Sequence, residues 1–167
     1  ASTIFFYSIC SVNSSLFAQY LDNFDIRFVL GMPYEKIAVI FNIGAIHSKL
    51  GAQQDRGSVD GTKKALKHFC FAAGAFNFVR ENVPSGTTTG DLSEYSLKMC
   101  TAIMLAQAQS CFYEKAVKEG HNRSLLAKLA NQTADYYNSA SGYARKMGHG
   151  LDKVWGETLV AQENGFR

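Results

Sequence analysis

Apolar positions recur along most of this chain at spacings of three, four and seven residues, which is the period of amphipathic helices. The pattern predicts helices over residues 14–30, 34–54, 59–82, 91–119, 123–147 and 152–167. Residues 1–12 are aromatic and β-branched and could form a short strand, whereas residues 83–90 are typical of a loop. Gly31 and Pro33 are expected to end the first helix, because proline suits the first position of the next one. The expected fold class is therefore all-α.

Capping residues lie where these helices are expected to begin and end. Ser58 is a suitable N-cap for the third helix, and Asn122 is one for the fifth. Gly120 suits the position just past the end of the fourth helix, where the backbone often turns left-handed. Asp91 and Glu94, three residues apart, resemble a capping box at the start of that helix.

Two of the expected helices carry unusually broad apolar faces. The apolar residues of the helix over 34–54 nearly encircle it, so it should be covered on several sides. In the fifth helix, a second apolar line widens the first into a core-sized face. The first line is Leu125, Leu129, Tyr136, Ala140, Tyr143 and Met147, and the second is Leu126, Ala130 and Tyr137. Long antiparallel helices with glycine and alanine at their crossings favour a tetratricopeptide-like solenoid, although no strict repeat is visible.

The composition changes this picture little. The chain has 167 residues, of which 47% are apolar and 19% charged, and this is typical of one globular domain over 1–167. No uncharged apolar run reaches the roughly eighteen residues that a membrane span needs. The net charge of +3 permits contact with acidic partners without requiring it. The four cysteines, at positions 10, 70, 100 and 111, form no C-x-x-C pair, so we expect reduced, buried thiols in a cytosolic protein.

No catalytic constellation stands out in the sequence. It has no glycine-rich phosphate loop, no Ser-His-Asp candidate and no phosphatase-type cysteine loop, so we expect no enzymatic activity and no cofactor. His47 and His68 could approach each other across the second and third helices. No carboxylate or cysteine completes a ligand set with them, so no metal site is expected. Basic residues do not alternate with exposed aromatics along one stripe, which argues against a nucleic-acid partner.

Five short motifs occur in an order that is more specific than any one of them. They are Tyr34-Glu-Lys36, Gly51-Ala-Gln-Gln-Asp-Arg56, Ala72-Ala-Gly-Ala-Phe76, Met104-Leu-Ala-Gln-Ala-Gln109 and Ala127-Lys-Leu-Ala-Asn-Gln132. This order resembles the Bro-domain family of the ALIX and His-domain protein tyrosine phosphatase type. The resemblance covers about residues 34–147, whereas residues 1–33 match poorly and the only tryptophan is Trp155. Because whole Bro domains are longer, the resemblance implies a core fragment, that is, a partial Bro domain.

The resemblance implies binding and not catalysis. Bro domains recruit ESCRT-III by holding an amphipathic C-terminal helix of the charged multivesicular body protein 4 class, in endosomal sorting and membrane remodelling. Such a scaffold is expected in the cytoplasm, recruited to endosomes. Carried over by motif, the residues that contact the partner helix are Phe112, Leu125, Leu129 and Asp60. Leu125 and Leu129 stack on one face of a helix, and Phe112 could join them to form a groove.

Alternatives to this hypothesis stay open. A phenylalanine and two leucines at helical spacing are, on sequence alone, more often core than binding residues. The same groove could bind a different peptide, as in rhophilin-like or pH-signalling relatives. Glu114 and Lys118 are expected to form a surface ion pair. Six lysines could form a basic patch that meets acidic residues of the partner or an anionic endosomal membrane, or they could be an ordinary solvated face. They are Lys63, Lys64, Lys67, Lys115, Lys118 and Lys128.

Overall fold

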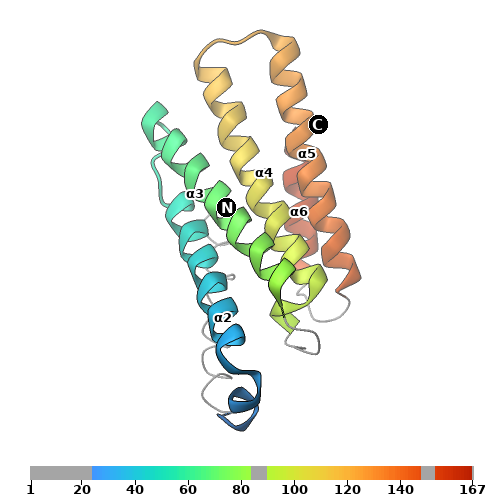
Figure 1. Cartoon of the computed structure of the whole chain (residues 1–167). Coiled ribbons are helices and arrows are strands. Elements are labelled where there is room, and N and C mark those ends of the chain that lie inside the picture. Colours follow the sequence, from blue (N-terminus) through green and yellow to red (C-terminus); the bar gives the residue numbers. More distant parts are fainter. Residues whose placement is uncertain (1–23, 84–89, 148–152, 167) are drawn as a thin grey trace.

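The computed structural model describes residues 24–83, 90–147 and 153–166, and within these ranges it contains helices but no strand. The helices are α2 (Phe24–Ala52), α3 (Val59–Asn82), the short 3-10 helix η1 (Gly90–Leu92), α4 (Glu94–Lys118), α5 (Arg123–Lys146) and α6 (Lys153–Phe166). Each long helix packs against the next one in the chain, and Figure 1 shows them as neighbouring antiparallel rods. The all-α, tetratricopeptide-like solenoid is therefore confirmed. The expected strand over 1–12 and most of the expected loop over 83–90 lie outside the described residues.

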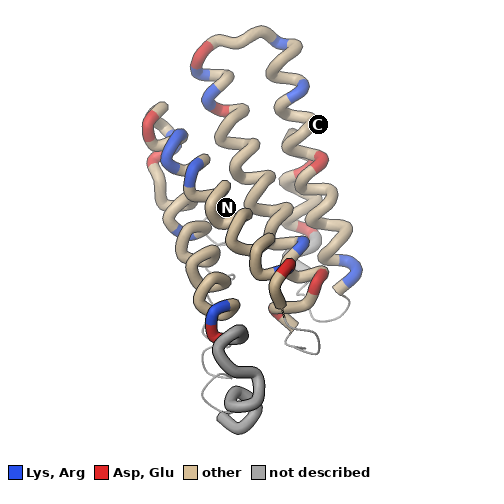
Figure 2. Tube along the Cα trace, viewed as in Figure 1, with Lys and Arg blue, Asp and Glu red and all other residues tan. Residues whose placement is uncertain are grey.

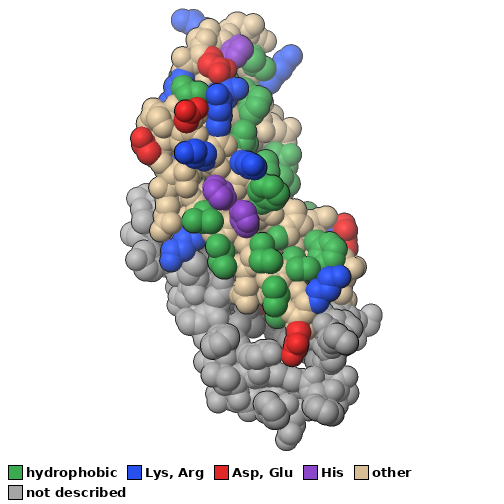
Figure 3. Space-filling model, turned by 60° about the vertical axis from the view of Figure 1, so that its left-hand side comes forward, with side chains coloured by type: hydrophobic (Ala, Val, Ile, Leu, Met, Phe, Trp, Pro, Cys, Tyr) green, Lys and Arg blue, Asp and Glu red, His purple; other side chains and the backbone are tan. Residues whose placement is uncertain are grey.

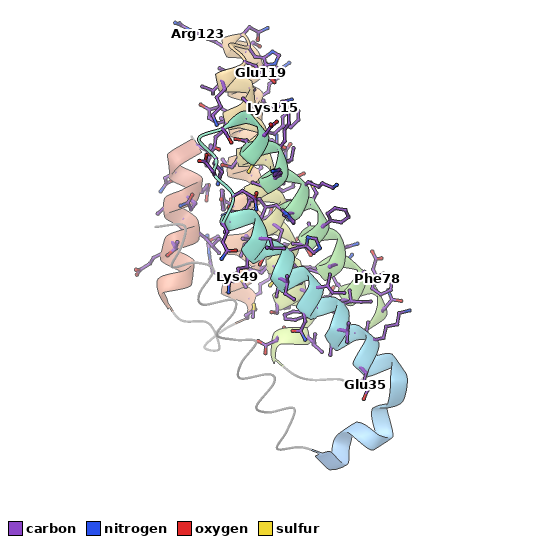
Figure 4. All side chains as sticks on the ribbon, turned by 90° about the vertical axis from the view of Figure 1, so that its left-hand side faces the viewer. Glu35, Lys49, Phe78, Lys115, Glu119 and Arg123 are labelled. Carbon is purple, nitrogen blue, oxygen red and sulfur yellow. The ribbon has the colours of Figure 1, made fainter. Side chains whose placement is uncertain are left out.

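The first described helix differs from its prediction. The break expected at Gly31 and Pro33 is wrong, because α2 runs without interruption from Phe24 to Ala52. Proline inside a helix removes one hydrogen bond and crowds the preceding turn, which can kink the helix without ending it. Figure 4 shows the first turns of α2 bending away from the axis of the rest. Residues 14–23, where the first expected helix begins, lie outside the described ranges.

Two of the predicted N-caps form as expected. The Ser58 hydroxyl accepts a hydrogen bond from the Gly61 amide at 3.0 Å, which caps α3. The Asn122 side chain accepts one from the Leu125 amide at 2.8 Å and caps α5. Each bond satisfies one of the backbone donors that a helix leaves without an internal partner at its start. The boundaries of both helices agree with the sequence prediction.

The capping box predicted at Asp91 and Glu94 is wrong. Asp91 lies in η1, and the N-cap of α4 is Ser93, whose hydroxyl accepts a hydrogen bond from the Ser96 amide at 3.3 Å. Glu94 is the first residue of the helix and forms an ion pair with Lys98 at 2.6 Å. The sequence offers two residues of capping type close together, and the short 3-10 turn decides which of them lies at the helix start.

The hydrophobic core lies between α3 and α4 and extends to α5. Its largest fully buried side chains include Phe69 and Phe76 of α3, Ile103 and Met104 of α4, and Tyr137 of α5. The described helices include none that is long and apolar enough to cross a membrane.

Glycines let α2 lie close against α3. A Cβ atom on Gly51 would lie 2.9 Å from the Phe69 ring, and one on Gly44 would lie 3.1 Å from the Phe76 ring. Both distances are tighter than normal carbon contacts, so only glycine fits without movement of a buried ring. The predicted small residues at helix crossings are thus confirmed at this interface.

The cysteines agree only in part with their prediction. Cys100 and Cys111 are buried free thiols, and burial raises their pKa to about 12 and about 11. A thiol with so high a pKa stays protonated at neutral pH and is a poor nucleophile. The expectation of burial is wrong for Cys70, which is an exposed free thiol on α3. Cys10 lies outside the described residues.

One side of α2 remains open to solvent, so the expectation that this helix is covered on several sides is wrong. Its buried side consists of Ile37, Phe41, Ala45 and Ser48. The opposite side carries four large apolar residues that keep a third or more of their surface exposed. They are Val39 (57%), Ile43 (45%), Ile46 (57%) and Leu50 (37%).

Candidate functional site on α4 and α5

The three apolar residues predicted to hold a partner helix lie at the surface or at its edge. Phe112, near the end of α4, and Leu125, in the first turn of α5, keep 44% and 36% of their surface exposed. Leu129, one turn further along α5, is partly buried. The buried stripe of α5 is a neighbouring one, which consists of Thr133, Ala134, Tyr137, Ala140, Ser141 and Ala144. The buried face of α5 is therefore rotated from the predicted one, and the first predicted line, apart from the buried Ala140, lies at its edge.

Helix periodicity and one electrostatic interaction place these residues on the same side of the helix pair. Phe112 lies two heptads from Lys98 on α4, and Leu125 lies five turns from Tyr143 on α5, so each pair shares a face. Lys98 and Tyr143 interact electrostatically, which joins the two faces at the far end of the pair. We call the residues Phe112, Leu125 and Leu129 the α4–α5 surface.

α6 covers a different side of the pair. The Phe166 ring lies 5.8 Å from the Tyr113 ring of α4 and 6.3 Å from the Tyr137 ring of α5, measured between ring centres. Tyr113 follows Phe112 by one position, which turns it about 100° around the helix axis. The α4–α5 surface therefore lies beside the contact with α6 and not beneath it.

A left-handed glycine fixes the connection between the two helices. Gly120 has a φ of 70°, as its predicted place past the end of α4 requires. Its amide donates to the Val117 carbonyl at 3.1 Å, and the His121 amide donates to the Ala116 carbonyl at 3.1 Å. These two bonds form a Schellman motif. The backbone thus sets how the three apolar side chains lie relative to one another.

Charged groups beside Phe112 form pairs of their own. Lys115 Nζ lies 5.8 Å from the centre of the Phe112 ring and 3.5 Å from Glu119 Oε1. Figure 4 shows Lys115 and Glu119 near the end of α4, with Arg123 beyond the turn. An exposed lysine–glutamate pair of this kind contributes little to stability. A partner's carboxylate could therefore take the place of Glu119 at small cost.

Asp60 lies in the first turn of α3 and not on α4 or α5. Its carboxylate is exposed and lies 3.9 Å from Lys63 Nζ. A carboxylate at this position is favourable for the helix itself, because the N-terminal end of a helix carries partial positive charge. Its role toward a partner stays a prediction.

The six lysines do not form a uniform basic patch. Lys118 donates to the Arg56 carbonyl and, at 3.1 Å, to Thr62 Oγ1, so it joins α4 to the start of α3. Lys67 Nζ lies 5.8 Å from the centre of the Phe71 ring. Figure 2 shows Asp and Glu among Lys and Arg where α3 begins and α4 ends. The lysines therefore differ in how freely a partner could reach them.

The surface pair predicted between Glu114 and Lys118 is wrong. Glu114 instead accepts two hydrogen bonds from Arg56, at 2.5 Å from Nη2 and 2.9 Å from Nε. Arg56 Nη2 also donates to Ser110 Oγ at 3.0 Å. This bidentate pair holds the α2–α3 connection against α4. Spacing within one helix could not reveal a partner 58 residues away in the sequence.

His47 and His68 meet across α2 and α3 as predicted. Their Nδ1 atoms are 3.0 Å apart, so one ring donates a hydrogen bond to the other. The Phe71 ring lies 5.3 Å from the His47 ring. Burial, then the charge of His47 and that of Lys67, lower the pKa of His68 below 6.5. In the described ranges, no group of three or more His, Cys, Asp or Glu residues could hold a metal ion.

Sequence reasoning missed part of the surroundings of this surface. Tyr136 and Tyr143 follow Leu125 and Leu129 along the edge of α5 and are half-buried, although the pattern placed them in the core. Tyrosine commonly sits at such an edge, because its ring is apolar and its hydroxyl favours water. That preference was the available signal, and the spacing of three residues between Phe112 and Lys115 on one helix was the signal for their contact.

A family model and several known proteins match this chain. A family model described as BRO1-like domain matches residues 29–167. Over 109 residues the chain is 43% identical to ALG-2 interacting protein X of Dictyostelium discoideum. The aligned segment covers 64% of the chain and 14% of that protein. Over 136 residues it is 33% identical to the pH-response regulator protein palA/RIM20 of Emericella nidulans. That alignment covers 80% of the chain and 16% of the relative. The chain thus spans a small part of either relative's length.

A solved structure of an ALIX BRO1 CHMP4C complex has the same helical arrangement. It aligns with a TM-score of 0.73 and 37% sequence identity, over 78% of this chain and 37% of that one. An alignment of this quality extends the likeness from sequence motifs to the placement of the helices.

Proposed function

Because the chain belongs to the BRO1-like domain family, we propose that it is a non-enzymatic scaffold that binds an amphipathic helix of an ESCRT-III subunit. The subunit would be of the charged multivesicular body protein 4 class, since the similar solved structure is of ALIX BRO1 with CHMP4C. The observation that carries the proposal is the exposure of Phe112 and Leu125 beside Leu129 on one side of α4 and α5.

The α4–α5 surface would supply part of the binding energy. Full burial of a large apolar side chain is worth about 1.5–3 kcal/mol. Because these three side chains are already partly covered, together they would contribute roughly 2–4 kcal/mol. Micromolar binding corresponds to about 8 kcal/mol. The partner's own apolar residues and contacts between charges would have to supply the rest.

Charge would set the orientation of the partner. Lys115 and Lys128 flank the α4–α5 surface and would meet acidic residues beside the partner's apolar face. Asp60 would meet a basic one. The lysines of α3 would favour an anionic endosomal membrane, at about 1 kcal/mol for each lysine near the lipid surface. The proposed setting is a scaffold formed by residues 1–167 as one domain in the cytoplasm, recruited to endosomes in sorting and membrane remodelling.

A titration tests the proposal directly. A fluorescently labelled C-terminal helix of charged multivesicular body protein 4 is titrated with the chain, and anisotropy reports binding. We expect Leu125→Asp to weaken binding at least about tenfold, because it places a charge in the apolar contact. Ala127→Asp is the matched control, since Ala127 is exposed and lies about 200° around the helix axis from Leu125. It should leave the affinity unchanged.

Two results would contradict the proposal. The first is a wild-type chain, shown by circular dichroism to be folded, that does not bind this helix. The second is a Leu125→Asp variant that binds as tightly as the wild type, which would move the site away from α4 and α5.

A second candidate keeps the surface and changes the ligand. The pH-response regulator relative matches 80% of the chain, which favours an adaptor that binds a different peptide in signalling. An array of amphipathic peptides distinguishes the two functions. The ESCRT-III function predicts that the ESCRT-III helix binds most tightly, whereas the signalling function predicts that another peptide binds most tightly. In both cases Leu125→Asp should weaken binding of the preferred peptide.

A further inference from the structure

We infer that a second apolar surface, on the outward side of α2 and α3, binds an acidic amphipathic helix of a partner protein. This α2–α3 surface consists of Val39, Ile43, Ile46 and Leu50 of α2 with Phe71 and Phe78 of α3. Figure 3 shows hydrophobic side chains gathered around a pair of histidines on this side of the molecule. The inference goes beyond the proposed function, because it concerns other helices and a different partner.

The spacing on α2 is that of a helix-binding seam. Val39, Ile43, Ile46 and Leu50 follow one another at intervals of four, three and four residues, as the a and d positions of a coiled coil do. Single exposed apolar residues are common on protein surfaces, but a continuous row of them marks an interaction site. A row with this period fits the apolar face of a helix.

α3 widens the row into a surface two helices across. Phe71 and Phe78 are seven residues apart on the same face of α3 and keep 53% and 37% of their surface exposed. The close approach of Gly44 to the Phe76 ring holds α2 and α3 together beneath the surface. Two contacts join the helices at the surface itself: the Phe71 ring with His47, and the Phe78 ring with Lys36 at 5.7 Å. A partner helix lying along α2 could therefore reach both phenylalanines.

Charge favours an acidic partner over a second copy of this chain. Lys36 and Lys67 each place an ammonium group within 6 Å of an exposed phenylalanine ring, at 5.7 and 5.8 Å. Lys49 and Lys64 are exposed on the same two helices, and Figure 4 shows Lys49 and Glu35 at separate points along α2. Carboxylates beside the partner's apolar row would complement these lysines. A second copy would bring these lysines toward one another, and of the acidic residues exposed on the two helices Asp60 and Glu81 already pair with Lys63 and Arg80.

A designed pair of probe peptides tests the inference. Both are labelled helices with leucine at the a and d positions. The acidic probe has glutamate at the e and g positions, and the basic probe has lysine there. Titrated with the full chain, the acidic probe should bind at least about tenfold more tightly than the basic one. Ile46→Asp should weaken its binding at least about tenfold, while Leu125→Asp should leave it unchanged.

The variants separate this inference from the proposed function. Ile46 is more than half exposed, so Ile46→Asp should leave the helical circular dichroism signal intact, and Ile46→Ser is a milder second variant. Ile46→Asp should also leave binding of the ESCRT-III helix unchanged. If Leu125→Asp weakens binding of the acidic probe as much as Ile46→Asp does, the probe binds at α4 and α5 and the inference is wrong.

Three further outcomes would overturn it. Equal binding of the two probes would remove the role of charge. Self-association in sedimentation, abolished by Ile46→Asp, would assign the surface to a second copy of the chain. Binding to phosphatidylserine vesicles that Ile46→Asp abolishes, without binding of the acidic probe, would assign it to a membrane.

Discussion

The α2–α3 surface and the α4–α5 surface carry similar apolar residues, but the chain supports them in different ways. The first depends on two glycines that let α2 lie within contact distance of buried phenylalanine rings. The second depends on Gly120, whose left-handed backbone sets the turn between its two helices. A surface supported by close packing should be sensitive to added volume. A surface supported by a turn should be sensitive to backbone conformation.

The largest expected effect comes from adding volume beneath the α2–α3 surface. In a Gly51→Val variant the new side chain meets the Phe69 ring, because even a Cβ atom there would lie 2.9 Å from it. Phe69 is fully buried and cannot move aside without disturbing the core. We expect a loss of about 2–3 kcal/mol in the free energy of unfolding, measured with urea. Binding of the acidic probe should weaken more than binding of the ESCRT-III helix.

Gly74→Ala is the matched control on the neighbouring helix. No atom outside the helix's own backbone lies within 4 Å of a Cβ built there, so alanine meets no obstacle. Alanine should stabilise α3 by about 0.5–1 kcal/mol, because it loses less conformational freedom than glycine on folding. If Gly51→Val proved as stable as the wild type, close packing would not be what supports this surface.

A smaller effect is expected at the turn beneath the α4–α5 surface. Gly120→Ala forces a residue with a Cβ atom to keep a φ of 70°, which costs about 1 kcal/mol. Gly120→Asn should cost less, since asparagine tolerates this conformation better. Thermal or urea unfolding of the two variants measures the difference. Equal stability of the two variants would show that the turn adopts another backbone conformation instead of holding alanine at a strained positive φ.

Local signals in the sequence predicted the helices well. Ser58 and Asn122 cap their helices as predicted, because an N-cap bonds only to residues two or three positions away. The pairing of Arg56 with Glu114 could not be predicted, since it joins residues 58 positions apart and depends on how α2, α3 and α4 pack. Pro33 was misread because a proline inside a helix and one at its start give the same local signal.

Periodicity alone could not identify either surface. It tells which residues share a face of a helix but not whether another element covers that face. Leu125 and Ala140 belong to one predicted stripe, yet Ala140 is buried and Leu125 is exposed. The order of motifs singled out Leu125, whereas no motif did so for Ile46. The α2 row was therefore expected to be covered, and its exposure became visible only in the structure.

The smallest effect expected is a dependence on pH that belongs to the α2–α3 surface alone. Burial, His47 and Lys67 lower the pKa of His68 below the ordinary value of 6.5. The unfolded chain therefore binds this proton more readily than the folded one. The stability associated with neutral His68 is complete above about pH 6.5 and falls as the pH drops through that value. Unfolding midpoints measured between about pH 7.5 and 5.5 should show this small decline.

Two histidine variants decide whether the decline comes from this pair. His68→Gln should flatten it, because glutamine carries no titrating group beside His47. His121→Gln is the control near the α4–α5 surface, where the His121 imidazole lies 3.3 Å from Glu119, and it should leave the decline in place. A decline that persists in His68→Gln would mean that another group of the chain takes up the proton. In that case mild acid would not distinguish the two surfaces. Their main physical difference would then be that close packing supports the α2–α3 surface, whereas the backbone conformation of a turn supports the α4–α5 surface.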